Sequence, residues 1–172
     1  KLAGYMRGTG PLFEGSARAA AYTWRAVCAL ALLGTLWFIF SHSAQPAAVS
    51  GAQSRGVLAF VNQALRGWGL PGVSEYLLRK AAHFAEFMVL GWWMLLCTRA
   101  FAARVARWMP WLWGAGILCA AADEGIQFFV PGRSARISDV LLDGCGVLAG
   151  LVLARAAIWA WTRLHGRAEQ RK

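Results

Sequence analysis

Apolar residues along the chain are concentrated in four long blocks, which shorter polar stretches separate. The blocks cover residues 21–40, 82–97, 110–130 and 140–161. A helix needs about 20 mostly apolar residues to cross a bilayer. Each block approaches this length if a few polar groups near its ends are tolerated, and such groups usually face a bundle interior or a water-filled cavity. The pattern therefore predicts an all-α, polytopic membrane protein with four transmembrane helices in a bundle.

The first block has a second interpretation. Arg18 precedes it, Arg25 lies within it and Ser41-His42-Ser43 follows it, as in a signal peptide with a cleavage site between small residues. However, the segment ahead of the block is long for a signal peptide, and aromatic residues flank the block as they flank a mature span. We expect an uncleaved helix, with cleavage as the alternative.

The longest connection, between the first two blocks, contains a helical pattern of its own. In SRGVLAFVNQALRGWGLPG, residues 54–72, apolar side chains recur at helical spacing at Val57, Val61, Leu65 and Trp68. Polar side chains occupy the other faces, and a Pro-Gly pair ends the pattern. We predict one amphipathic interfacial helix on the membrane surface. A lid packed over the bundle is the alternative.

Composition supports a membrane location. Of the 172 residues, 58% are hydrophobic and 15% are charged, whereas a soluble domain carries about a quarter charged residues. The formal net charge of +10 fits attraction to anionic lipid head groups. We expect no nucleic-acid partner, because the pattern contains no soluble basic domain to bind one.

Basic residues predict the orientation. For a four-span chain, eleven of the 18 lysines and arginines fall on the side of the two termini and six on the other side, with Arg155 inside the last block. The side richer in Lys and Arg is usually cytoplasmic. We therefore expect a cytoplasmic N-terminal segment at 1–20, a membrane domain at 21–161 and a basic cytoplasmic tail at 162–172.

This orientation brings the polar groups within the blocks to the outer end of the bundle. The first block ends there with FSHSAQ, and the other three contribute acids, amides and cations. Asp139 and Asp143 are four residues apart, so they point the same way from one helix. We expect His83, Glu124 and Asp143 to lie within reach of one another, directly or through one water.

Each polar residue also has a structural explanation that the sequence leaves open. Asp139 follows a serine at a helix start, where a carboxylate can serve as an N-cap. Glu86 could pair with a neighbouring Arg or Lys, and Gln127 could bond an adjacent helix. Arg133 and Arg136, which follow a Pro-Gly turn, could be solvated or could meet lipid phosphates.

Two stretches resemble a known family. RKAAHFAEFMVLG, from Arg79 to Gly91, and DEGIQFFVPGRSARISDVLLDGCGVLAG, from Asp123 to Gly150, are similar to the VanZ-like family of bacterial membrane proteins. The ordered set K-x-x-H, D-E-x-x-Q, P-G-R and D-x-x-x-D/N-x-x-G carries the resemblance, and FSHSAQ is similar to a Ser-Ser-Gln stretch of that family. The resemblance covers the region from the first block to the end of the fourth.

The resemblance implies a small multi-span protein of the bacterial inner membrane, in a family whose named member is linked to resistance to the glycopeptide teicoplanin. The family's polar positions fall on Lys80, His83, Glu86, Asp123, Glu124, Gln127, Arg133, Asp139 and Asp143. The chain departs from the family at Phe87, where Tyr is common, and at Asp143, where Asn is common. The second departure adds a carboxylate, which favours metal binding or a shared proton.

Three functions are compatible with these residues. One is an enzyme acting at the outer face on an anionic cell-envelope lipid or lipid-linked precursor. Another is a non-catalytic lipid- or antibiotic-binding or structural membrane protein, and the third is a proton-coupled carrier. The expected catalytic residues are His83, Glu124, Asp139 and Asp143. The expected substrate-binding residues are Lys80, Glu86, Asp123, Gln127, Arg133 and Arg136. The carboxylates also suit a divalent metal, whose identity stays open, as does the oligomeric state.

Overall fold

The computed structural model describes residues 11–102 and 105–169, and every element in these ranges is a helix. The helices are α1 (Pro11–Ser43), α2 (Ala47–Gly67), α3 (Glu75–Phe101), the short 3-10 helix η1 (Val105–Trp108), α4 (Met109–Phe128) and α5 (Ile137–Glu169). The prediction of an all-α protein is therefore confirmed. Of the two segments predicted to be cytoplasmic, residues 1–10 and 170–172 lie outside the described part of the chain.

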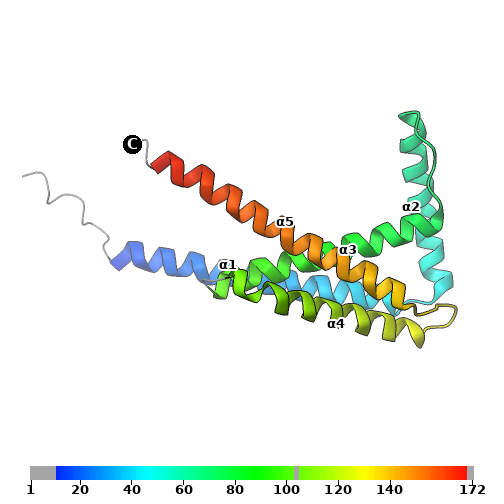
Figure 1. Cartoon of the computed structure of the whole chain (residues 1–172), viewed down its shortest axis with the longest axis horizontal. Coiled ribbons are helices and arrows are strands. Elements are labelled where there is room, and N and C mark those ends of the chain that lie inside the picture. The colour runs from blue at the N-terminus through cyan, green and yellow to red at the C-terminus, as the bar shows by residue number, and fades with distance from the viewer. Residues whose placement is uncertain (1–10, 103–104, 170–172) are drawn as a thin grey trace, which may run out of the picture.

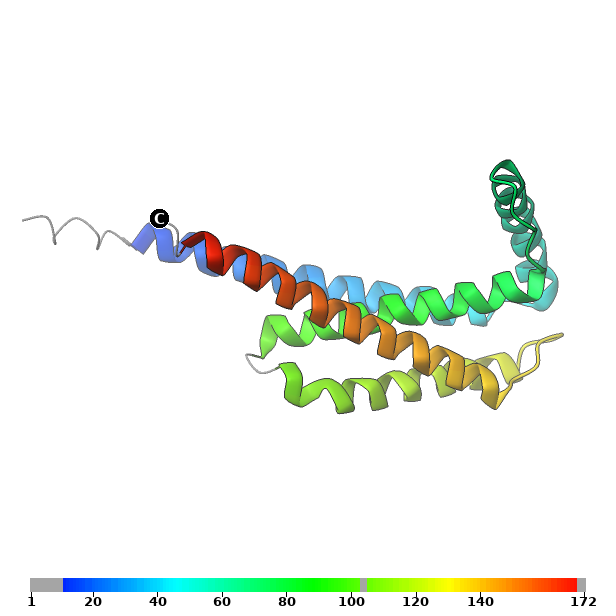
Figure 2. The ribbon, with the colours of Figure 1, turned by 45° about the horizontal axis from the view of Figure 1, so that its top comes forward.

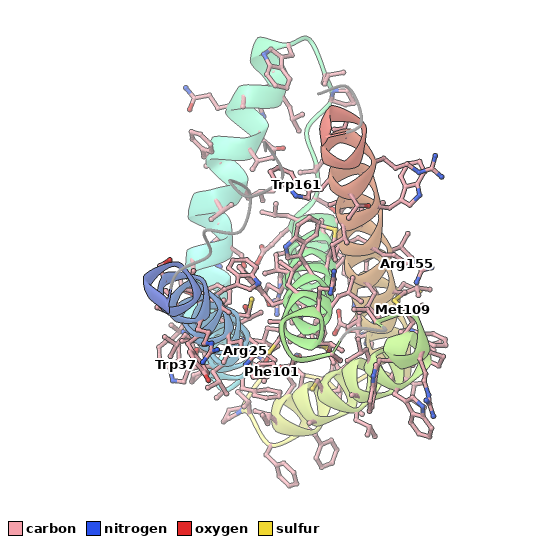
Figure 3. The ribbon with its side chains drawn as sticks, turned by 90° about the vertical axis from the view of Figure 1, so that its left-hand side faces the viewer. Arg25, Trp37, Phe101, Met109, Arg155 and Trp161 are labelled. Atoms are coloured by element: carbon pink, nitrogen blue, oxygen red, sulfur yellow. The ribbon has the colours of Figure 1, made fainter. Side chains whose placement is uncertain are left out.

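Four helices run alongside one another in alternating directions. These are α1, α3, α4 and α5. The start of α1 and the end of α5 lie at the same end of the molecule, here called the terminal end (Figures 1 and 2). α2 stands at the opposite end, here called the α2 end (Figure 1). Viewed from the terminal end, α3 lies between α1 and α5, and it contacts α4 as well (Figure 3). Residues that face inwards from α3 therefore have neighbours on three sides.

Three of these helices, rather than the four predicted, are long and apolar enough to cross a membrane. They are α1, α3 and α5, over Arg18–Ser43, Glu75–Phe101 and Ile137–Leu164. α4, the predicted third span, has 20 residues and is about 30 Å long. Asp123, Glu124 and Gln127 in its last turns lower its mean hydropathy. Because these three side chains are buried, α4 contributes polar groups to the bundle interior.

Small residues let α3 and α5, which run in the same direction, approach closely. Gly146 and Gly150 on α5 have the G-x-x-x-G spacing that allows helix backbones to meet. A Cβ atom on Gly146 would lie 2.5 Å from the carbonyl oxygen of Phe84, and one on Gly91 would lie 2.2 Å from that of Val147. This crossing holds the polar first turns of α3 and α5 side by side.

The side chains are apolar both inside and outside the bundle. The buried core consists of Ile39, Phe87, Leu90, Met94, Leu95, Ala120, Val147, Leu151 and Ala154. On the outside, Leu30 of α1 is 69% exposed and Leu118 of α4 is 72% exposed. Extensive exposed apolar surface of this kind marks a membrane or protein contact. The long apolar helices make a lipid contact the natural explanation.

Both ends of α3 have side-chain partners. At its start, Ser74 Oγ accepts a hydrogen bond from the N–H of Leu77 at 3.2 Å. At its end, Arg25 Nε donates to the carbonyl oxygen of Ala100 at 3.0 Å, and the guanidinium lies over the Phe101 ring (Figure 3). Arg25, the charge within the first apolar block, therefore satisfies a carbonyl that the helix itself leaves free.

α2 confirms the predicted helix, although it begins earlier, at Ala47. Its second half projects away from the bundle, and Phe60 and Trp68 are 74% and 80% exposed (Figure 1). Asn62 fastens the returning chain, since its Nδ2 donates to the carbonyl oxygen of Val73 at 3.1 Å and its Oδ1 accepts from the Val73 N–H at 2.7 Å. The alternative, a lid packed over the bundle, fits only the first half of α2. That half covers a cavity described below. The membrane-surface position of α2 stays a prediction.

Candidate functional site

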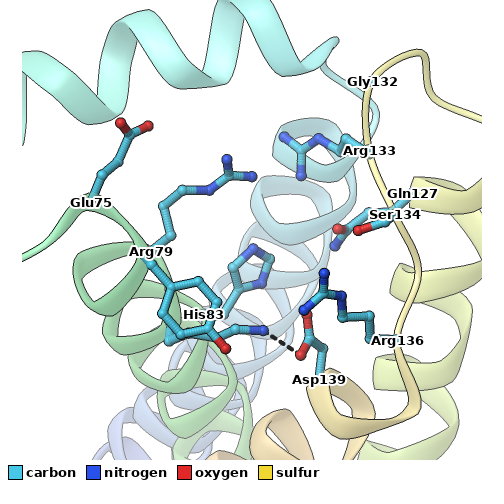
Figure 4. A pocket seen from close by; sticks show the side chains of 11 residues that line it. Glu75, Arg79, His83, Gln127, Gly132, Arg133, Ser134, Arg136 and Asp139 are labelled. Carbon is cyan, nitrogen blue, oxygen red and sulfur yellow. Dashed lines mark ion pairs between the residues drawn. The ribbon is translucent and has the colours of Figure 1, made fainter.

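A cavity of about 390 Å³ opens at the α2 end, between the first turns of α3 and the turn joining α4 to α5 (Figure 4). We call it the cationic cavity. Its lining is mostly charged or polar: Glu75, Tyr76, Arg79, Lys80, His83, Gln127, Gly132, Arg133, Ser134, Arg136 and Asp139. Six of the ten residues predicted for the site are among them. The structure thus brings together residues from three separate stretches of sequence.

Four cationic side chains surround the cavity: Arg79, Lys80, Arg133 and Arg136. Arg133 is held from the end of α1, because its Nε donates to the carbonyl oxygen of Gln45 and its Nη2 to that of His42, each at 3.0 Å. Burial lowers the pKa of Arg133 from its usual value, and the guanidinium of Arg79 lowers it further. An arginine nevertheless stays charged at neutral pH. The cavity therefore favours an anionic ligand.

An ion pair between Lys80 of α3 and Asp139 of α5 crosses one side of the cavity (Figure 4). Asp139 also accepts a hydrogen bond from the Ser138 hydroxyl at 3.0 Å. Because α5 begins at Ile137, Asp139 lies inside its first turn, and its carboxylate pairs with Lys80 instead of capping the helix. The N-cap alternative is therefore wrong. The pair joins the two parallel helices at the mouth of the cavity.

His83 lies at the boundary between the cationic cavity and a second cavity of about 370 Å³. The second cavity lies under the first half of α2 and shares Arg79, His83 and Arg133 with the first. Glu86 lines this second cavity together with Arg133, and it does not line the cationic cavity. Lys80 pairs with Asp139, and among the described residues no ion pair joins Glu86 to Lys80 or Arg79, so the alternative of a structural ion pair for Glu86 is not observed.

Behind the cationic cavity, α3, α4 and α5 bring three metal-ligand side chains together. One ring nitrogen of His83 and one carboxylate oxygen each of Asp123 and Asp143 lie within 4.8 Å of one another. Asp123 is 0% exposed and Asp143 is 1% exposed. The sequence pattern predicted Glu124 as the partner of His83 and Asp143, and Asp123 takes that place. Among the described residues, these three could hold a metal ion.

Glu124 has a different partner. Its Oε2 accepts a hydrogen bond from the backbone N–H of Arg136 at 2.8 Å. This contact fixes the chain immediately before α5, where helix N–H groups need acceptors. The buried carboxylate of Glu124 thus supports the turn that carries Arg133 and Arg136. The structure does not place it with His83.

Gln127 links α4 to α1, as its structural explanation predicted. Its Nε2 donates to Asp123 Oδ2 at 2.9 Å and lies 3.3 Å from Ser43 Oγ, to which it also donates. All three side chains are buried. The amide therefore orients Asp123 and connects it to the end of α1.

Of the site residues outside the predicted set, two bear on the arrangement of the site. Arg79 lines both cavities, and its position one turn before His83 on α3 was the sequence signal for it. Ser43 is buried against Gln127, and its place in FSHSAQ indicated proximity without a role. The other four predicted residues lie behind the cationic cavity, in the second cavity or beneath the turn: Asp123, Asp143, Glu86 and Glu124.

Comparison with known proteins confirms the resemblance found in the sequence. Residues 28–160 match the VanZ/LLP1 family, and this range contains α2 to α4, the second half of α1, most of α5 and every residue of the two cavities. No curated protein and no solved structure shows significant similarity to the chain. The match extends over far more than half of the 172 residues, so the chain belongs to the VanZ/LLP1 family, and its three long apolar helices indicate a membrane protein of the VanZ type.

Proposed function

We propose that the protein binds the phosphate-bearing head group of a cell-envelope lipid, or of a lipid-linked envelope precursor, in the cationic cavity. The observation that carries this proposal is the convergence of Arg79, Arg133 and Arg136 on one cavity beside apolar helices. Guanidinium groups bind phosphate through paired, charge-assisted hydrogen bonds. A ligand with an anionic head and an apolar tail matches both the cavity and the surface next to it.

His83 supplies the chemistry in this proposal. Its ring lines the same cavity as the arginines, and histidine exchanges protons near neutral pH (Figure 4). In this proposal, a phosphate held by Arg79 and Arg136 exchanges a proton with the imidazole at a phosphate or leaving-group oxygen. The protein is then an enzyme acting on the bound lipid. A protein that only binds the lipid needs the arginines and not His83.

The cavity faces the outside of the bacterial inner membrane, and both termini are cytoplasmic. The support is the distribution of charge: a separate pocket at the terminal end is lined by Arg99, Arg107 and Arg155. The cytoplasmic side of membrane proteins is enriched in Lys and Arg. Because the chain belongs to a family whose named member is linked to teicoplanin resistance, we extend the proposal to glycopeptide resistance.

The purified protein in lipid nanodiscs, mixed with radiolabelled lipid-linked precursor, tests this function. Binding is measured by retention, and products are separated by thin-layer chromatography. Arg79→Ala and Arg136→Ala are expected to weaken binding at least about tenfold each, since each removes charge-assisted hydrogen bonds of about 1.5–3 kcal/mol. Arg99→Ala, at the terminal end, is the matched control and should bind as the parent does.

The same assay separates catalysis from binding. His83→Ala should retain binding and lose all product formation if the protein is an enzyme. Equal product yields from the parent and His83→Ala would exclude His83 as the acid or base. Binding that none of the arginine substitutions weakens would remove the cationic cavity as the lipid site.

A further inference from the structure

The side chains of His83, Asp123 and Asp143 come from three different helices and meet in the bundle interior. One ligand atom of each lies within 4.8 Å of the other two. Residues 83, 123 and 143 are far apart in the sequence, so only the packing of α3, α4 and α5 produces this group. Both aspartates are almost completely buried.

Several polar atoms of this group are buried and have no hydrogen-bond partner among the described residues. They are both carboxylate oxygens of Asp143, Oδ1 of Asp123 and Nδ1 of His83. A buried polar atom that makes no hydrogen bond is costly, and a buried charge without a partner is more costly still. Two carboxylates beside each other add mutual repulsion to this cost. Such an arrangement requires either bound protons or a bound cation.

We propose that His83, Asp123 and Asp143 hold one divalent transition-metal ion. One imidazole nitrogen and two carboxylate oxygens form a ligand set that suits Zn²⁺ or Mn²⁺. Bonds of about 2.0–2.2 Å around such an ion place neighbouring ligand atoms roughly 3.3 Å apart, so binding draws the three side chains slightly inwards. Three protein ligands leave one or more coordination positions open.

Asp123 is already positioned for this role. Its Oδ2 accepts a hydrogen bond from Gln127 Nε2 at 2.9 Å, while its Oδ1 has no hydrogen-bond partner in the part of the chain that the structure describes. Carboxylates that bind metals are commonly oriented in this way by a second hydrogen-bonding residue. Gln127 is itself held by Ser43 at 3.3 Å. Gln127 is therefore a positioning residue for Asp123 rather than a ligand.

Two side chains connect the proposed metal site to the cationic cavity. They are His83 and Gln127, both of which line that cavity. An open coordination position on this side would face an anion bound by the arginines, and with the ion bound, a water in that position rather than the His83 ring would exchange the proton. This last connection rests on the function proposed above. The metal site itself does not, because its residues, burial and unpartnered atoms are independent of any lipid.

Metal content tests the site directly. The protein is purified with a tag that contains no histidine, in chelator-free detergent buffer, and its metals are measured by inductively coupled plasma mass spectrometry. The parent should carry about one Zn²⁺ or Mn²⁺ per chain. Asp123→Asn and Asp143→Asn should lower this content at least tenfold. Glu124→Gln, a change of the adjacent buried acid on the same helix, is the matched control and should keep the metal.

Thermal unfolding provides the second readout. Protein stripped with EDTA should gain melting temperature when Zn²⁺ or Mn²⁺ is added, because an ion that binds only the folded state stabilises it. Asp143→Asn should show no such gain. A parent that is purified without metal, and whose melting temperature neither ion changes, overturns the proposal in favour of shared protons. Lipid binding that persists after EDTA treatment would then leave the proposed lipid site standing without the metal.

Discussion

Gly150 of α5 lies directly against the backbone of α3 at Met88. A Cβ atom on Gly150 would come within 1.9 Å of the Met88 carbonyl oxygen and 2.8 Å of the Trp92 nitrogen. No side chain can occupy that space unless the two helices separate. The contact lies about two helical turns beyond Asp143, so the same close crossing sets the distance between Asp143 and His83.

Gly150→Ala is therefore expected to destabilise the protein. Forcing atoms into a closely packed contact costs about 1–3 kcal/mol or more, and separation of α3 from α5 should also reduce lipid binding or metal binding at the site. Thermal unfolding in detergent measures the first effect. Gly34→Ala is the control, because a Cβ atom at Gly34 meets nothing within 4 Å. Equal melting temperatures for the two variants would contradict the close crossing.

Arg133→Ala should lower stability as well as ligand binding. The change removes two hydrogen bonds from a charged group to the Gln45 and His42 carbonyl oxygens, and bonds of this kind contribute about 1.5–3 kcal/mol each. Arg136→Ala removes only an exposed side chain and should leave the melting temperature nearly unchanged. The two arginines are thus expected to differ in stability measurements and to agree in binding measurements. A loss of stability in Arg136→Ala alone would reverse these assignments.

Glu124→Ala and Glu124→Gln are expected to behave differently. Alanine leaves the backbone N–H of Arg136 without its acceptor, which costs about 1–3 kcal/mol, whereas the glutamine oxygen can still accept the bond. Melting temperatures of the two variants, compared with the parent, provide the measurement. If Glu124→Gln lowers the melting temperature as much as Glu124→Ala does, the negative charge of Glu124 is required. Its role is then more than accepting the hydrogen bond that supports the turn.

The Lys80–Asp139 pair should contribute modestly to stability. Both side chains are 21% exposed, so solvent screens their attraction, and we expect a coupling energy of about 0.5–1 kcal/mol. A double-mutant cycle with Lys80→Ala and Asp139→Ala measures it. The coupling should decrease in high salt. A coupling that is zero in low salt would show that the pair does not join α3 to α5 in solution.

The proposed topology can be tested with reporters. A reporter fused after Lys172 should read cytoplasmic, and one inserted near Gly72, in the exposed chain after α2, should read external. The physical reason is the greater number of basic residues on the side of the termini. Opposite readings would place the cationic cavity on the cytoplasmic side and exclude an outer-face substrate.

The sequence by itself determined the helices and the end of the bundle at which the polar groups gather. Apolar blocks of near-spanning length can bury their backbone only as helices in a membrane. The placement of Lys80, His83 and Asp139 near the starts of two blocks, and of Gln127 near the end of another, brings them to one level once the helices alternate in direction. The family resemblance rested on the same residues.

Only the tertiary structure decided which acid faces His83. Asp123 and Glu124 are consecutive on a helix and point about 100° apart, and both lie near the apolar residues of α4, so local spacing does not distinguish them. The rotation of α4 is set by contacts distant in sequence. A Cβ atom on Gly116 would lie 2.4 Å from the Val147 side chain, and Trp113 Nε1 donates to the Gly144 carbonyl oxygen at 3.0 Å. Those contacts turn Asp123 towards His83 and leave Glu124 to the turn before α5.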